Sequence, residues 1–105
     1  MKRKITIQTE IEVSFDENSQ EFKDLFENYN NHFHECDLET FSENIALIIA
    51  HEGVKQNIEG IGAVLINGKP QKTESGEIIN HFINVEGHFY HSGEVVFEVA
   101  ENEQL

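Results

Sequence analysis

The sequence predicts a single α+β domain in which two helices pack on one face of a mainly antiparallel sheet of about four strands. Its 105 residues suffice for one hydrophobic core and are too few for two. Apolar residues alternate with polar ones near the start of the chain, whereas they recur at helical spacing in the middle. The remaining apolar segments are short and follow one another without a linker. The expected order is therefore strand, helix, helix, strand, strand, strand, in one domain that spans residues 1–105.

The first half of the chain predicts one strand and both helices. Every second residue of Lys4–Phe15 is apolar or threonine, which is typical of a strand with one buried face. A polar turn follows, and apolar spacing then predicts a helix over 18–30. The second helix is expected to begin after Asp37, a capping residue, and to end at Gly53. Its apolar stripe consists of Leu38, Phe41, Ile45, Ile48 and Ile49.

The second half predicts three strands, which span Ile58–Asn67, Glu77–Val85 and Glu94–Ala100. The first of these enters a turn at Asn67-Gly68, after which Lys69-Pro70 begins the return. Residues 86–93, between the other two strands, are bounded by glycine and predict a hairpin tip. We expect the tail from Glu101 to be loose.

Net charge is the strongest compositional signal, because 20 acidic residues stand against 7 Lys and Arg and leave the chain at −13. Lys and Arg are absent from three long segments, 5–22, 24–54 and 73–105. A field of this sign repels nucleic acid and attracts basic protein surfaces, including those that hold nucleic acid. We therefore expect a protein partner with a basic nucleic-acid-binding surface and no direct nucleic acid binding. The alternative interpretation is that the acidity serves solubility alone.

Neither a membrane helix nor a disulfide is expected. No apolar run reaches the length of a membrane span, and the basic start Met1–Lys4 precedes alternating Ile and Thr instead of an apolar signal segment. The single cysteine, Cys36, excludes an internal disulfide and fits a reducing compartment. We expect the protein to be cytoplasmic, in a bacterial host.

Histidine and cysteine gather in two short segments that predict a structural zinc site. In the first, His32, His34 and Cys36 would point to one side of an extended chain. In the second, the spacing of His88 and His91 suits two ligands from one turn. We expect Cys36 and His34 to join His88 and His91 in a closed site of four ligands, with His32 as the substitute. The alternative interpretation is that the histidines are solvated loop residues and that Cys36 is a small buried apolar side chain.

Two patterns suggest an enzyme instead. His32-Phe33-His34 followed by Glu39 resembles the HxH…E metal-binding run of cupins, which implies a β barrel, but Glu39 begins a helical segment and the cupin glycine beyond it is missing. Cys36 could act as a nucleophile with a histidine base. Its neighbours Glu35 and Asp37 oppose thiolate formation. We therefore expect no catalytic activity, with a metal-dependent enzyme or metal-sensing domain as the alternative.

In size, charge and compact α+β organisation, the whole chain resembles the small acidic proteins of bacteriophages and mobile elements, among them anti-CRISPR inhibitors of RNA-guided nucleases. The resemblance carries no motif that transfers residue by residue. It implies a non-enzymatic inhibitor that docks on a basic surface of a CRISPR effector and blocks nucleic acid loading. Glu94 and Glu98 are the first charge-reversal targets. A phage structural or assembly protein is the further alternative, with Phe33, Phe89 and Tyr90 as interface anchors.

Overall fold

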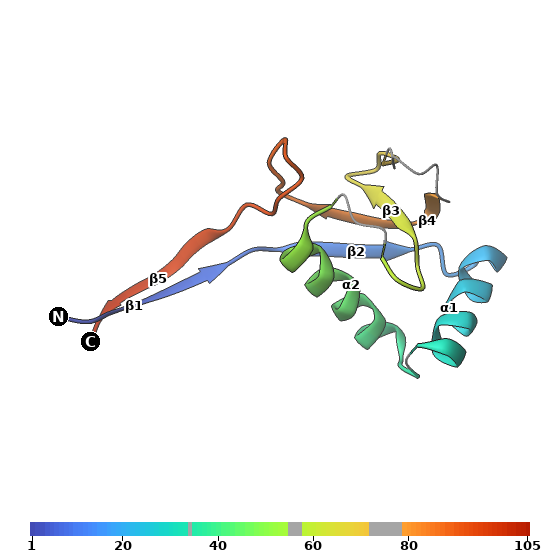
Figure 1. The fold of residues 1–105 in the computed structure, drawn as a ribbon, viewed down its shortest axis with the longest axis horizontal. Helices are drawn as coiled ribbons and strands as arrows, with labels where there is room; N and C mark the ends of the chain where they lie inside the picture. The colour runs from blue at the N-terminus through green and yellow to red at the C-terminus, as the bar shows by residue number, and fades with distance from the viewer. Residues whose placement is uncertain (34, 55–57, 72–78) are drawn as a thin grey trace.

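The computed structural model describes residues 1–33, 35–54, 58–71 and 79–105 (Figure 1). The described residues form two helices and five strands, which confirms the α+β class. The elements are β1 (Arg3–Gln8), β2 (Ile11–Phe15), α1 (Gln20–His32), α2 (Leu38–Glu52), β3 (Ala63–Ile66), β4 (Ile79–Gly87) and β5 (Glu98–Gln104). Neither helix among these residues is long and apolar enough to cross a membrane.

The expectation of one sheet of about four strands is wrong. β2, β4 and β3 form a three-stranded sheet in that order, and β1 and β5 form a separate two-stranded sheet, called the ribbon below. β4 runs antiparallel to β2 and parallel to β3. Apolar periodicity reveals that a segment is extended, but it does not reveal which segment pairs with it.

The first predicted strand is divided because its partner strand is interrupted. Ile11 pairs with Gly87, and Gln8 pairs with Glu98. Residues 88–97 therefore lie outside the ladder, at the point where Thr9 and Glu10 separate β1 from β2. β2 therefore continues into the body of the molecule while β1 projects from it with β5 (Figure 1). The molecule is elongated, with principal extents of 55 × 30 × 21 Å.

Both helices begin after residues that cap them, and α2 also ends at a capping glycine. The Phe22 backbone N–H donates to the Ser19 hydroxyl at 3.4 Å ahead of α1, which starts two residues later than predicted. The Thr40 N–H donates to the Asp37 carboxylate at 2.8 Å, and Gly53 ends α2 with φ 86°. These bonds satisfy orphaned N–H groups of the first turns and confirm the predicted caps of α2.

Two tight turns also follow the prediction. Asn67 and Gly68 both have positive φ, and Ile66 and Lys69 exchange backbone hydrogen bonds across them. Residues 69–71, the described residues that follow this turn, form no strand with β3; β3 pairs with β4 instead. In the predicted hairpin tip, the Tyr90 N–H donates to the Glu94 carbonyl at 2.8 Å.

The C-terminal region differs from its prediction. The last strand begins at Glu98 instead of Glu94, and the tail expected to be loose belongs to β5, where Glu101 pairs with Thr6 and Glu103 pairs with Lys4. The paired residues are far apart in the sequence, so no local pattern predicts their pairing. Of the strand predicted over Glu77–Val85, residues 77 and 78 lie outside the described part of the chain.

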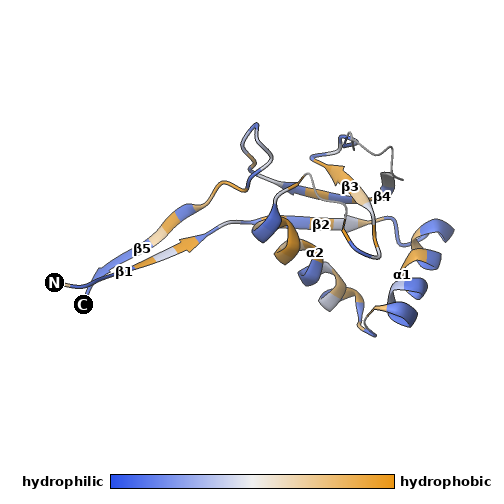
Figure 2. Ribbon diagram, in the orientation of Figure 1, coloured by the Kyte–Doolittle hydropathy of each residue, from blue (hydrophilic) through white to orange (hydrophobic). Residues whose placement is uncertain are grey.

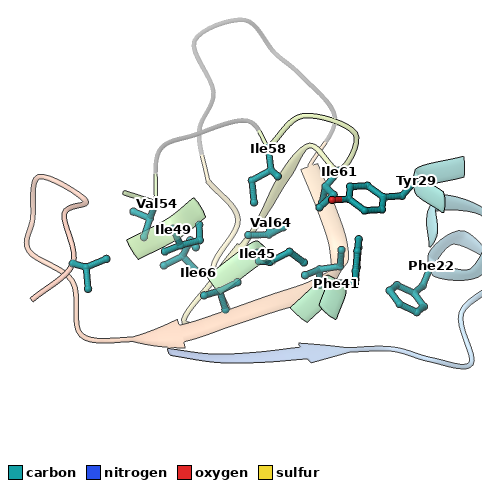
Figure 3. Close-up of a cluster of buried hydrophobic side chains, with 13 residues drawn as sticks. Phe22, Tyr29, Phe41, Ile45, Ile49, Val54, Ile58, Ile61, Val64 and Ile66 are labelled. Atoms are coloured by element: carbon teal, nitrogen blue, oxygen red, sulfur yellow. The ribbon is translucent and has the colours of Figure 1, made fainter. Parts of the chain in front are cut away.

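The hydrophobic core lies between the helices and the three-stranded sheet (Figure 3). Its fully buried side chains come from α2 and β4: Phe41, Ile45, Ile49, Ile83 and Val85. The ring of Phe41 lies 4.9 Å from that of Tyr29 and 5.2 Å from that of Phe26, in edge-to-face contact. Burial of each large apolar side chain stabilises the fold by about 1.5–3 kcal/mol, so the predicted stripe of α2 anchors the body.

Candidate functional site

The residues of the first predicted zinc-binding segment lie between the two helices. His32 is the last residue of α1 and is exposed, and Cys36 is half-buried ahead of α2. His34 lies outside the described residues. The Cys36 N–H donates to the Asn30 side-chain oxygen at 2.6 Å, and the Asn30 amide in turn donates to the Phe26 carbonyl. This chain of bonds fixes the backbone of Cys36 against the last turns of α1.

The second predicted segment lies at the opposite end of α2. His88 and His91 are exposed in the excursion 88–97, which is joined to the C-terminal end of α2 by the Val54 N–H bond to the Gly93 carbonyl at 2.9 Å. The 15 residues of α2 span about 22 Å at 1.5 Å per residue. The structure therefore does not bring Cys36 together with the two histidines. No group of three or more His, Cys, Asp or Glu suited to a metal occurs among the described residues, and zinc binding stays a prediction.

The environment of Cys36 favours the protonated thiol. Partial burial raises the pKa of this thiol above its ordinary value, and the neighbouring carboxylate of Asp37 raises it further. A protonated thiol is a weak nucleophile and a poor metal ligand. The two remaining histidines are both exposed, His51 in the last turn of α2, where a positive charge is favoured by the helix dipole, and His81 in β4.

A groove of about 790 Å³ lies where the ribbon leaves the three-stranded sheet. Its lining comes from both sides of the interruption: Gln8, Thr9, Glu10, Ile11, Glu12, Glu86, Gly87, His88, Val96 and Glu98. The Thr9 hydroxyl donates to the Val96 carbonyl at 3.0 Å and holds the two sides together. Four of these residues are glutamates, and none of the described lining residues is Lys or Arg. We call this feature the acidic groove.

Two of the four carboxylates face each other across the strands. Glu12 pairs directly with Glu86 in the β2–β4 register, which places their Cβ atoms about 4.5–5.5 Å apart. The Asn84 amide donates to the Glu86 carboxylate at 3.2 Å and orients it. Like charges directly opposite each other destabilise a sheet. The groove therefore concentrates negative charge at a position where the direct opposition of two carboxylates costs stability.

Strand alternation explains why the carboxylates point away from the core. Ile11 and Val13 of β2 pack against the core cluster, so Glu10 and Glu12 point to the opposite, exposed face. Glu10, Glu12 and Glu86 were not among the site residues predicted from the sequence. The alternation of polar and apolar residues over Lys4–Phe15 was a signal for Glu10 and Glu12, whereas the pairing of Glu12 with Glu86 has no local signal. Of the two predicted acidic residues, Glu94 and Glu98, the second lines the acidic groove.

Charge is distributed unevenly over the whole molecule. Of the 20 acidic residues, Glu74 and Glu77 lie outside the described residues and the other 18 are exposed. The described cations gather at the tip of the ribbon, in Lys2, Arg3 and Lys4, with Lys23 and Lys69 elsewhere.

Comparison of the chain with models of protein families, with curated proteins and with solved structures finds no match.

Proposed function

We propose that this protein is a non-enzymatic acidic inhibitor that binds a basic, nucleic-acid-binding surface of another protein through the acidic groove. The observation that carries the proposal is the direct opposition of Glu12 and Glu86 in a groove that also receives Glu10 and Glu98. A lysine or arginine side chain from a partner would relieve the repulsion between these carboxylates. Binding would then gain from contacts that the free protein lacks.

The partner that we propose is an RNA-guided nuclease of the CRISPR type in a bacterial cytoplasm. Such nucleases hold their guide–target duplex in a positively charged channel through backbone contacts. The negative charge of the acidic groove continues into β5 at Glu98 and Glu101, which pair with Gln8 and Thr6 on one face of β1. An elongated row of carboxylates of this kind can occupy a channel built for a phosphate backbone. The resemblance in size and charge to anti-CRISPR proteins supports this choice of partner.

The experiment measures the loading of labelled guide RNA or target DNA onto purified RNA-guided nucleases by fluorescence anisotropy. We expect the wild-type protein to prevent loading when it is added first. A variant with Glu12→Gln, Glu86→Gln and Glu98→Gln should be at least tenfold less effective. A matched control with Glu17→Gln, Glu43→Gln and Glu59→Gln has the same net charge and should inhibit like the wild type. Loading that is unaffected across a panel of effectors would contradict the proposed partner.

Zinc binding is a second part of the proposal, with a structural role. Because α2 separates Cys36 from His88, a zinc ion bound by one chain would take its ligands from residues near only one end of α2. The Cys36 thiol must lose its proton to bind zinc, so the metal has to overcome the raised pKa of this group. Native mass spectrometry of protein purified without chelator should detect one zinc per chain, lost in Cys36→Ser and retained in His88→Ala. A folded, metal-free wild type would remove zinc from the account. An open coordination position in a zinc-loaded protein would favour the alternative of a metal-dependent enzyme or metal-sensing domain.

A structural or assembly protein of a phage is the second candidate function. The observation that favours it is exposure of large apolar side chains, including Phe33 at 44% and Tyr90 at 57%. Phe89, the third anchor considered from the sequence, is partly buried against the core cluster. Assembly into oligomers larger than a dimer at micromolar concentration would favour this function over the inhibitor.

A further inference from the structure

One face of the ribbon exposes a cluster of apolar side chains near its base. Ile7 pairs with Val99, and Ile5, which pairs with Asn102, lies two residues before Ile7 on the same face of β1. Phe97 precedes Val99 by two residues. These side chains are 46% (Ile5), 59% (Ile7), 65% (Val99) and 50% (Phe97) exposed. Figure 2 shows the apolar stretches on both strands of the ribbon. We call this surface the ribbon face.

The ribbon face continues the face of β2 that packs against the core. Alternation carries the apolar side of β1 into Ile11, Val13 and Phe15, which contact the core cluster beneath the helices. Along the ribbon, no described element takes the place of the helices. A two-stranded antiparallel sheet without a packed face is marginal in water. The ribbon face therefore calls for a cover of the kind that the helices supply to β2.

The two ends of the ribbon carry opposite charge. Its tip bears the three cations Lys2, Arg3 and Lys4, with one carboxylate, Glu103, opposite Lys4. At its base, a hollow of about 280 Å³ lies between the end of α2 and residues 94–97, and its lining includes Glu52, Glu94 and Phe97 together with His51. The C-terminal end of a helix is the negative end of its dipole, which adds to these carboxylates. A basic tip and an acidic hollow on the same chain make the surface complementary to itself.

We propose that a second copy of this chain covers the ribbon face, with the two ribbons antiparallel about a two-fold axis near Thr6. In this arrangement the residue three positions before Thr6 lies level with the residue three positions after it. Arg3 of one copy then lies level with Thr9 of the other, whose hydroxyl is bonded to Val96, next to Phe97 and the acidic hollow. A closed two-fold pair buries the same face on both chains.

Charge complementarity favours antiparallel ribbons over parallel ones. Parallel ribbons would bring two basic tips together, whereas antiparallel ribbons bring each tip to the acidic hollow of its partner. The net charge of −13 on each copy opposes association at long range, but at physiological ionic strength this repulsion is screened beyond about 8 Å. None of the four apolar residues of the ribbon face lines the acidic groove, so the dimer does not depend on the proposed function.

Sedimentation equilibrium of the full chain at about 150 mM salt tests the interface, since exposed charges are then screened. We expect a reversible dimer whose dissociation constant rises at least tenfold in Ile7→Thr with Val99→Thr. Threonine keeps the β-branched shape that favours strands. The control is Leu47→Gln, which removes an apolar side chain of similar exposure, 56%, from the outside of α2 and should leave the dimer unchanged.

A charge exchange tests the antiparallel arrangement independently of the apolar residues. Arg3→Glu should weaken the dimer at least tenfold, and adding Glu52→Arg with Glu94→Arg should restore it. A monomeric wild type at millimolar concentration overturns the proposal, as does a dimer that ignores both sets of substitutions. Failure of the exchange to restore association overturns the antiparallel arrangement. Circular dichroism confirms that each variant retains its helices.

Discussion

Glu12 and Glu86 are the residues at which stability and the proposed function diverge most clearly. Their direct cross-strand opposition costs the fold about 0.2–1 kcal/mol, the usual size of a pair effect in a sheet. Residues that reduce stability without a structural gain are typical of binding surfaces, because binding supplies the missing contact. The pair is therefore a sensitive position for experiment.

Replacement of one carboxylate by its neutral isostere should stabilise the free protein. We expect Glu12→Gln to raise the midpoint of thermal unfolding by about 1–5 °C, because it removes the repulsion while keeping the side-chain volume. Differential scanning calorimetry measures the shift. Glu59→Gln, which changes net charge equally outside the acidic groove, should shift the midpoint less. A lower midpoint for Glu12→Gln would mean that the carboxylate has a favourable partner within the chain.

Asp37 gives a pH dependence whose sign is fixed by its bonds. The backbone N–H of Thr40 and then its hydroxyl donate to the carboxylate and lower the pKa of Asp37 below its ordinary value of 3.8. A group with a depressed pKa in the folded state stabilises the fold above its unfolded pKa. That contribution is lost as the pH falls below 3.8 through the folded pKa.

Comparison with Asp37→Asn isolates this contribution, since asparagine caps a helix equally well without a charge. We expect the wild type to unfold at a higher temperature than the variant near neutral pH, and the difference to vanish between about pH 5 and pH 2. Thermal unfolding followed by circular dichroism across this range measures it. A difference that does not change with pH would show that the ionised carboxylate makes no special contribution.

At the scale of elements, α2 connects the core to the excursion that lines the acidic groove. Gly53 ends α2 with φ 86°, and a Cβ at this position would meet the Gly93 carbonyl oxygen at 3.0 Å. The adjacent Val54 N–H bonds to that same carbonyl. The end of α2 and the turn of the excursion are thus in close backbone contact, which positions the groove relative to the core.

Gly53→Ala should therefore destabilise the protein by about 1–3 kcal/mol, through both the left-handed backbone and the close contact. Gly68→Ala is the matched comparison, because Gly68 also has positive φ, 77°, but has no atom within 4 Å of the added Cβ. It should cost only about 1 kcal/mol. Chemical denaturation measures both. Equal losses would show that the contact between Gly53 and Gly93 adds nothing.

The helices could be predicted from the sequence because their determinants are local. The caps at Asp37 and Gly53 and the stripe that includes Phe41 lie within one element, and all three occur as expected. Strand partners depend on distant residues. The pairing of Glu101 with Thr6 and the parallel contact between β3 and β4 have no local signal, so the number of sheets was wrong.

At the scale of the whole molecule, composition predicted the negative surface but not the place where the charge converges. The acidic groove exists because residues 88–97 interrupt the pairing between the two ends of the chain, and this interruption is a tertiary feature. The histidine and cysteine residues are close in sequence within each of the two predicted segments. The length of α2, however, places His88 far from Cys36. Short-range spacing predicts which ligands share a segment, not which segments meet.

The described surface divides into two faces with different chemistry. One side of the segment that contains β1 and β2 presents the carboxylates of Glu10 and Glu12 to solvent. The apolar residues on the other side pack against the core over β2 and are exposed over β1. The first face supports binding of a cationic partner, and the second supports association with another copy. The two consecutive strands β1 and β2 thus contribute to both proposed interfaces.

The most direct test of the acidic groove as a binding site is the binding of a fluorescent decalysine peptide, followed by anisotropy at about 150 mM salt. The wild type should bind, and the variant Glu12→Gln, Glu86→Gln, Glu98→Gln should bind at least tenfold more weakly. The charge-matched control Glu17→Gln, Glu43→Gln, Glu59→Gln should bind like the wild type. Equal weakening of both variants would mean that the peptide senses only net charge, and it would contradict a binding role for the acidic groove.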